Sequence, residues 1–143
     1  MYQGYISAEK IWFARHEGKY EGAEGLEAFS SALEANPPAT QLKAVCIDYS
    51  DVTSATLEDT DRANTTFFVG QFARYKQQVD SLLVVRVFNP KNVAINKILR
   101  EIDARMAGPF VDLGTIVEVY SVPEAIETLG LSADYCIEYP AKQ

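Results

Sequence analysis

Hydroxyl and carboxylate side chains are concentrated in one stretch of the chain, DYSDVTSATLEDTDR, which directly follows the apolar run LKAVCI. Hydroxyl groups can accept phosphate, and exposed carboxylates can steer a protein partner, so we interpret this stretch as a partner-binding loop followed by a helix start. The candidate partner-binding residues are Asp48, Ser50, Asp51, Thr53, Ser54, Thr56, Glu58, Asp59 and Asp61.

Each of these residue types also has a purely local explanation. An Asp at the carboxyl end of a strand, where we place Asp48, often hydrogen-bonds to its own turn, and Ser and Thr often cap helices. Acidic residues such as Glu58 and Asp59 in the first turn of a helix interact favourably with the helix dipole. Local and partner-binding roles are both compatible with the sequence.

Side chains that commonly serve in catalysis or metal binding are few. His16 is the only histidine, and no nucleophile or orienting group can be assigned to it, so we predict a structural role. Cys46 and Cys136 lack metal-ligand spacing, and we expect reduced thiols, with a disulfide between them as the alternative. The chain has no glycine-rich phosphate loop and no HExxH motif. We therefore expect a non-enzymatic protein without cofactor or metal.

Aromatic side chains are numerous, with eight Tyr and seven Phe. An aromatic cluster can line a pocket for a small apolar ligand such as a lipid, and the candidate contacts are Trp12, Phe67 and Phe68. Phe67 and Phe68 are adjacent on a predicted helix, so one of them must point away from its main apolar stripe. For Trp12, the alternative is an ordinary core position.

Length and charge limit the classes of protein that need be considered. The chain has 143 residues and a net charge of -7. We predict one domain over residues 1–143, with 131–143 as a C-terminal extension. The negative charge disfavours nucleic acid as a partner. No apolar run approaches the ~20 residues that span a bilayer, so we expect no transmembrane segment and a cytoplasmic protein.

Hydrophobic periodicity predicts strands that alternate with helices. YQGYI and KIWFARHEGKY indicate a pair of N-terminal strands, and LKAVCIDY, SLLVVRVF and TIVEVY indicate three more. Helices are predicted from EGLEAFSSALEAN, from the segment that contains FFVGQFARYKQQV, from the segment after Asn89 and Pro90, and from a capping box at Ser121. The result is an α/β fold with a mainly parallel central sheet of four to five strands, helices packed against it and the N-terminal strands at one side.

Two segments carry further expectations. The helix after the acidic stretch has apolar residues at helical spacing only in its second half, at Phe68, Phe72, Tyr75 and Val79. We therefore expect its polar first half to face solvent. Tyr135, Ile137 and Tyr139 alternate near the end of the chain, which predicts an extended segment that either docks on the domain or pairs with a second copy in a homodimer.

The order of elements, together with IDYSDVTS and VYSVPEAIETLG, resembles the SpoIIAA-like branch of the STAS fold, which includes sulfate transporter domains and anti-sigma factor antagonists. The resemblance covers about residues 8 to 131. It implies a regulatory or protein-interaction domain, and it allows a carrier or sensor of a small apolar ligand. In the antagonists, a kinase phosphorylates an Asp-Ser-Ser/Thr-Gly motif. Thr56, Leu57 and Glu58 stand near that place here, so we expect no control by a kinase on this loop.

Overall fold

The computed structural model describes residues 2–36, 41–107 and 114–140, and the side chains of 68, 71–81, 106–107 and 114 lie outside that description. The elements are β1 (Tyr2–Ile6), β2 (Ile11–Glu21), α1 (Gly22–Ala35), β3 (Leu42–Thr56), α2 (Thr60–Gln78), β4 (Val79–Val87), α3 (Val93–Ala107), β5 (Gly114–Val119) and α4 (Val122–Thr128). No helix within the described ranges has the length and apolar character needed to cross a membrane.

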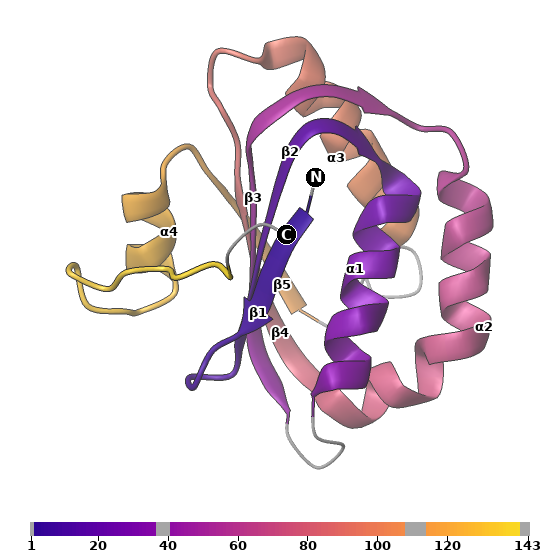
Figure 1. The fold of residues 1–143 in the computed structure, drawn as a ribbon, viewed down its shortest axis with the longest axis horizontal. Helices are drawn as coiled ribbons and strands as arrows, with labels where there is room; N and C mark the ends of the chain where they lie inside the picture. The colour runs from indigo at the N-terminus through magenta and orange to yellow at the C-terminus, as the bar shows by residue number, and fades with distance from the viewer. Residues whose placement is uncertain (1, 37–40, 108–113, 141–143) are drawn as a thin grey trace.

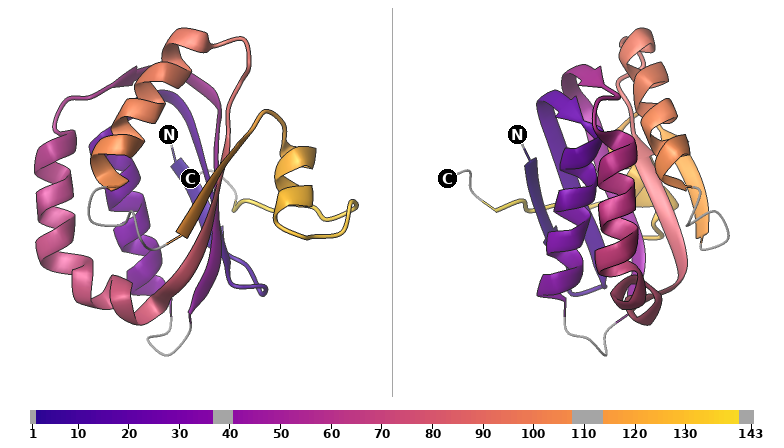
Figure 2. Two further views of the ribbon diagram at one scale, coloured as in Figure 1. Left: turned by 180° about the vertical axis from the view of Figure 1, so that it is seen from behind. Right: turned by 90° about the vertical axis from the view of Figure 1, so that its right-hand side faces the viewer.

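The centre of the fold is a five-stranded sheet in the order β1-β2-β3-β4-β5. β1 pairs antiparallel with β2, and the remaining neighbours are parallel. Helices α1, α2 and α3 cover one face, whereas α4 and residues 131–140 lie on the other (Figures 1 and 2). The predicted α/β class is confirmed. The parallel part contains β2 as well as the three strands predicted for it, because β2 pairs with β1 along one edge and with β3 along the other.

Local sequence signals account for several helix boundaries. α1 ends at Ala35, and its C-cap, Asn36, is the residue before the two prolines of the sequence. α4 begins at the predicted capping box, where the Ser121 hydroxyl accepts a hydrogen bond from the backbone N–H of Glu124 at 3.3 Å. The expectation that Asn89 and Pro90 start a helix is wrong, because α3 begins at Val93. Asn89 instead accepts a hydrogen bond from the backbone N–H of Lys91 at 3.0 Å, which closes a local turn.

The acidic stretch after LKAVCI is mostly strand, and this corrects the predicted loop. β3 continues to Thr56, which pairs with Glu21 of β2. Two register shifts each place an extra residue in β3, and such bulges bend a strand without ending it. Tyr49 and Val52 are buried in this extension. Asp51, Thr53 and Ser54 are exposed along this continuing strand, whereas Asp48 is buried.

α2 was expected from its sequence to have a solvent-facing first half and an apolar second half, and this can be compared only at its described side chains. Asp61, Arg62, Thr65 and Thr66 of its first half are exposed, as expected. Phe67 is buried and stacks on Phe29 of α1 with ring centroids 5.7 Å apart. The predicted stripe from Phe68 to Val79 lies outside the described side chains, and Val79 is the first residue of β4, not a helical residue.

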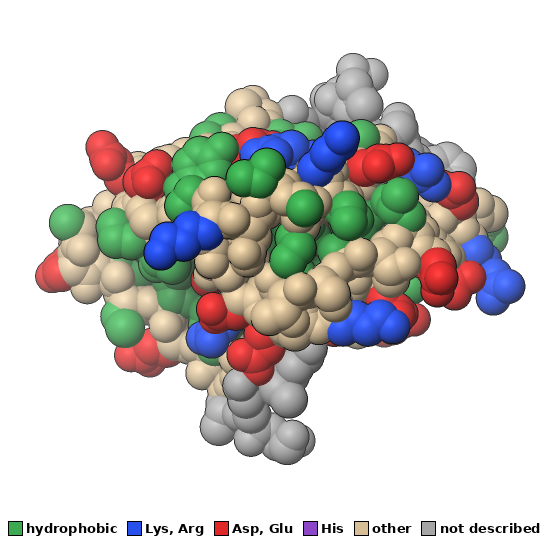
Figure 3. Space-filling model, turned by 90° about the horizontal axis from the view of Figure 1, so that it is seen from above, with side chains coloured by type: hydrophobic (Ala, Val, Ile, Leu, Met, Phe, Trp, Pro, Cys, Tyr) green, Lys and Arg blue, Asp and Glu red, His purple; other side chains and the backbone are tan. Residues whose placement is uncertain are grey.

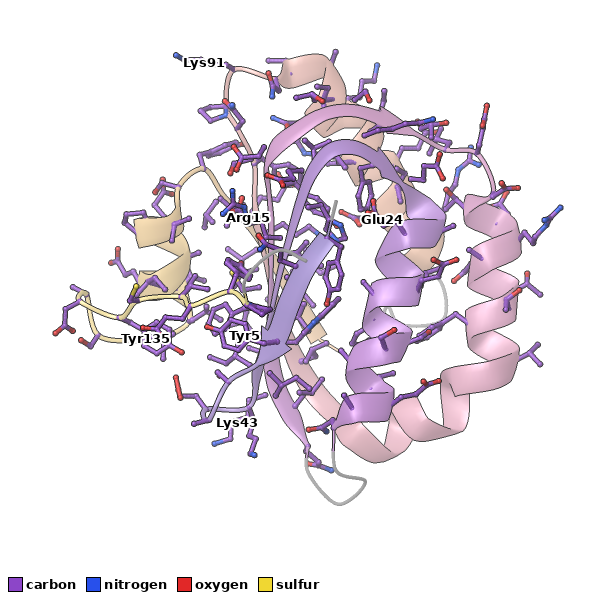
Figure 4. The ribbon with its side chains drawn as sticks, viewed as in Figure 1. Tyr5, Arg15, Glu24, Lys43, Lys91 and Tyr135 are labelled. Atoms are coloured by element: carbon purple, nitrogen blue, oxygen red, sulfur yellow. The ribbon has the colours of Figure 1, made fainter. Side chains whose placement is uncertain are left out.

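Residues 131–140 dock on the sheet face opposite α1, as one of the two predictions for this segment had it, and pairing with a second copy stays a prediction (Figure 1). Tyr135 stacks on Phe13, and Tyr139 meets Tyr5 edge to face with ring centroids 5.9 Å apart. The Tyr139 hydroxyl donates to the backbone oxygen of Ala14 at 3.3 Å. Figure 4 shows Tyr5 and Tyr135 on this side of the sheet.

Candidate functional site: a cavity with one polar end

A cavity of about 110 Å³ lies between the sheet and helices α1 and α3. Its apolar lining comes from three strands and one helix: Trp12, Leu26, Phe29, Val45, Ile47, Leu82 and Val84. Its polar lining is supplied by His16, Tyr20, Tyr49, Arg86 and Asp103. An apolar pocket with a few convergent polar groups is the usual form of a small-molecule site.

Strand alternation and one glycine position this lining. Trp12, Ala14 and His16 are spaced by two along β2, so all three point to the helix-covered face. Gly25 of α1 also lines the cavity, and a Cβ at that position would collide with the Tyr20 hydroxyl. The absence of a side chain at Gly25 therefore lets α1 approach the tyrosine closely.

His16 is buried, with 1% of its surface exposed, and neither of its ring nitrogens has a hydrogen-bond partner among the described residues. Its Nδ1 atom lies 3.8 Å from a carboxylate oxygen of Glu24, beyond hydrogen-bond distance. The ring is held among tyrosines, 4.7 Å from Tyr20 and 5.8 Å from Tyr49 between centroids. Figure 4 shows Glu24 on the first turns of α1, on the side of the sheet that holds the cavity.

The buried Asp103 forms an ion pair with the partly buried Arg86 at the polar end of the cavity. Arg86 Nε lies 2.9 Å from Asp103 Oδ2, although the two are not aligned as a hydrogen bond. The Tyr49 hydroxyl donates a long hydrogen bond of 3.5 Å to Asp103 Oδ1. Breaking such a pair by removing one partner typically costs about 3–5 kcal/mol, because the other charge is then left buried and uncompensated.

Burial controls the protonation of these groups. Desolvation lowers the pKa of His16 to about 3, so the imidazole is neutral near pH 7. Burial also raises the pKa of Asp103 to about 6, with Arg86 opposing that rise, and it raises the pKa of Tyr20 and of Tyr49. At neutral pH the polar end thus contains one balanced ion pair and otherwise neutral side chains.

No protein-family model matches this sequence, and no curated protein matches it. The geometry of the described residues is therefore the basis for any functional argument.

The predicted partner-binding residues lie away from the cavity. Asp48 is buried in β3, where its Oδ1 accepts hydrogen bonds from the Ser50 backbone N–H at 2.9 Å and from the Ser50 hydroxyl at 2.6 Å. Asp48 thus makes local hydrogen bonds, but within β3 and not in a turn after a strand end as predicted. Asp51 is exposed and pairs with Arg15 at 3.1 Å.

The remaining members of that set are on the surface or partly exposed. Thr53 and Ser54 are exposed on β3, and the Thr56 hydroxyl accepts a hydrogen bond from the Glu58 backbone N–H at 3.2 Å. Glu58, Asp59 and Asp61 are exposed around the start of α2. Figure 3 views the end of the molecule at the top of Figure 1 and shows acidic and basic side chains interspersed there.

Of the predicted apolar contacts, Trp12 lines the cavity and is 3% exposed. Phe67 is buried one layer further out, because Phe29 stacks between it and Trp12. The side chain of Phe68 lies outside the described residues. Trp12 is therefore the one predicted contact that the structure places at the cavity wall.

Sequence reasoning missed the polar end of the cavity. Arg86 interrupts the apolar strand SLLVVRVF, and Asp103 follows Leu99 and Ile102 on a helix that buries both. A charge inside an apolar run is a usable signal, because a buried charge needs a partner. The structural role predicted for His16 stays a prediction: its ring packs against Tyr20 and Tyr49, and its two nitrogens have no hydrogen-bond partner among the described residues.

Three larger hollows lie elsewhere in the described part of the molecule. A groove of about 540 Å³ runs between α1 and α2, and another of about 520 Å³ lies between β1 and α1. A third, of about 310 Å³, lies under residues 135–139 and is lined by Cys46, Asp48 and Tyr139. Cys46 is buried, Cys136 is exposed, and both are free. Within the described ranges no three His, Cys, Asp or Glu side chains are grouped as metal ligands.

Proposed function

We propose that this protein binds a small, mainly apolar molecule in the cavity between its sheet and helices α1 and α3. The observation that carries the proposal is the cavity itself, about 110 Å³ in volume, lined on most sides by aromatic and aliphatic groups and at one end by buried polar groups. A dry apolar cavity of ~150 Å³ in another protein binds benzene, so the smaller volume here limits the ligand to about one small ring.

Binding accounts for the cavity better than catalysis does. A catalytic histidine is usually oriented by a hydrogen bond from one ring nitrogen to another side chain, and no described residue makes such a bond to His16. Transfer of an apolar ligand from water into the cavity, in contrast, needs no further group, because it gains the free energy of apolar burial at roughly 25 cal/mol per Å². The activity is therefore that of a carrier or sensor.

Toluene is a suitable probe because Trp12 is the only tryptophan in the chain and lines the cavity. We expect toluene to change the Trp12 fluorescence saturably and to raise the melting temperature, since a ligand that binds only the folded state stabilises it. Val84→Phe fills the cavity from β4 and should abolish both effects. Val69→Phe is the matched control, because Val69 is 81% exposed on α2.

Circular dichroism must show that Val84→Phe is still folded, because overpacking commonly costs about 1–3 kcal/mol. An unchanged response to toluene in folded Val84→Phe, or no response in the native protein, would contradict the proposal.

Interaction with a protein partner through the exposed acidic residues stays a second proposal, carried over from the sequence. The observation in its favour is that Glu58 and Asp61 are exposed at the start of α2. Asp61 pairs with the exposed Arg105 at 3.5 Å, and such surface pairs contribute about 0–1 kcal/mol.

We expect Glu58→Lys combined with Asp61→Lys to abolish capture of a partner from cell extract while the melting temperature stays nearly unchanged. Glu127→Lys on α4 is the control charge reversal, because α4 lies on the opposite face of the sheet (Figure 1). A complex that survives both reversals would exclude this face.

A further inference from the structure

We infer that the ligand of the cavity carries a neutral hydrogen-bonding group, such as a hydroxyl or carbonyl, which pairs with His16. This inference rests on the proposed function and specifies the chemical class of its ligand. It follows from the unpaired nitrogens of His16, from the arrangement of polar and apolar groups along the strands, and from the charge balance at the polar end.

The hydrogen bonding of His16 indicates that the cavity holds a polar group. Both ring nitrogens are buried without a hydrogen-bond partner among the described residues. A neutral imidazole offers one donor and one acceptor, and buried polar side chains in native proteins are almost always paired. Because His16 lines the cavity, a ligand or a water molecule within it is the group that can pair with those nitrogens.

The lining of the cavity changes from apolar to polar along β2, β3 and β4. Trp12 pairs with Val45, and Val45 pairs with Val84, so these side chains form one level across three parallel strands. His16, Tyr49 and Arg86 lie further toward the carboxyl ends of the same three strands. The cavity is therefore apolar at one end and polar at the other, which matches a ligand with an apolar body and a polar group at one end.

The charged side chains that line the cavity favour a neutral ligand. Arg86 is the cationic side chain of the lining, and Asp103 balances it at 2.9 Å. An anionic ligand would have to displace Asp103 from Arg86 or face the carboxylate, and a cationic ligand would face the guanidinium. A neutral group can pair with His16 without disturbing the ion pair.

Phenol and toluene test the inference, because they have nearly the same size and differ by a hydroxyl. Isothermal titration calorimetry of the native protein should show phenol binding about tenfold or more tightly than toluene, the preference expected for one buried hydrogen bond. His16→Phe should reduce that preference to within about twofold. His16→Gln retains a donor and an acceptor and should restore part of the preference.

The outcomes separate this inference from the function on which it rests. If neither compound binds, the proposed function fails. If both bind the native protein equally well, the cavity binds apolar molecules but His16 is satisfied by water, and the inference fails. A phenol preference that persists in His16→Phe also overturns it, because the hydrogen bond must then go elsewhere.

Charge is tested with isobutyramide and isobutyrate, which have the same shape. The neutral amide should bind at least about tenfold more tightly than the carboxylate. Arg86 is already balanced by Asp103, so it does not compensate for the cost of burying a second carboxylate. Tighter binding of isobutyrate would overturn the neutral class and assign Arg86 as an anion contact.

Discussion

His16 occupies a position at which a histidine is costly when the cavity is empty. Its nitrogens lose their hydrogen bonds to water on folding and gain none from the described residues. An unsatisfied buried polar group costs about 1–3 kcal/mol. Residues that recognise ligands often reduce stability in this way, because the group that must bind the ligand is unpaired before it arrives. The same residue can therefore be tested through stability as well as through binding.

We predict that His16→Phe raises the free energy of unfolding, and that the gain grows as the pH falls. An unfolded histidine titrates near 6.5, whereas burial lowers the pKa of folded His16 to about 3. Between these values the unfolded state binds a proton that the folded state does not, so the native protein loses about 1.4 kcal/mol per pH unit through His16 below pH 6.5.

Urea unfolding of both proteins at pH 7, 6 and 5 measures this difference. Glu24, the carboxylate nearest His16, has a pKa raised by burial, but it is present in both proteins and its contribution largely cancels in the comparison. Parallel stability curves for the two proteins would mean that folded His16 titrates normally and is not desolvated.

At the scale of elements, β3 explains why the acidic stretch was misinterpreted. Strand periodicity continues through it, with Tyr49 and Val52 buried, but the two bulges shift the alternation of exposed and buried residues. A pattern that slips by one residue twice cannot be recognised as a strand by counting every second position. The strand is stabilised instead by its partner β2, which extends to Glu21.

The C-terminal segment is the other element whose role depends on packing. Tyr139 is held both by the edge-to-face contact with Tyr5 and by the hydrogen bond to Ala14. Between the same two segments, the Tyr5 hydroxyl accepts a hydrogen bond from the backbone N–H of Glu138 at 3.0 Å. Removal of the Tyr139 ring should therefore loosen the whole segment from the sheet.

We predict that Tyr139→Ala lowers the free energy of unfolding by about 2 kcal/mol, less than the ~3–5 kcal/mol of a fully buried aromatic residue because Tyr139 is half-buried. Tyr139→Phe removes only the hydroxyl and should cost about 1 kcal/mol. Hydrogen exchange should show faster exchange of the Glu138 amide in Tyr139→Ala. Unchanged protection of that amide would mean that Tyr139 does not hold the segment in place.

At the scale of the whole molecule, one sheet connects three groups of buried residues. β2 shows the connection, because Trp12 packs beneath α1 whereas Phe13, the next residue, packs beneath residues 131–140. A third group, which includes Tyr49 and Phe88, lies beneath α3. The cavity lies where the first and third groups meet, and five elements contribute to it: β2, β3, β4, α1 and α3.

The sequence by itself determined the α/β class, the N-terminal strand pair, most of the helix and strand segments and the Ser121 capping box. These features depend on residues close together in the chain, through periodicity of two or 3.6 and through capping. They can be recognised without knowing which element packs on which. The aromatic content also singled out Trp12, which lines the cavity.

Only the tertiary structure decided the extension of β3, the docking of the C-terminal segment and the polar end of the cavity. His16, Arg86 and Asp103 belong to three different elements. They line the same end of the cavity only because the fold brings these elements together. The protonation of His16 and of Asp103 depends on burial, which is a property of the assembled core. Local patterns cannot encode such a site, because it forms only where five elements converge.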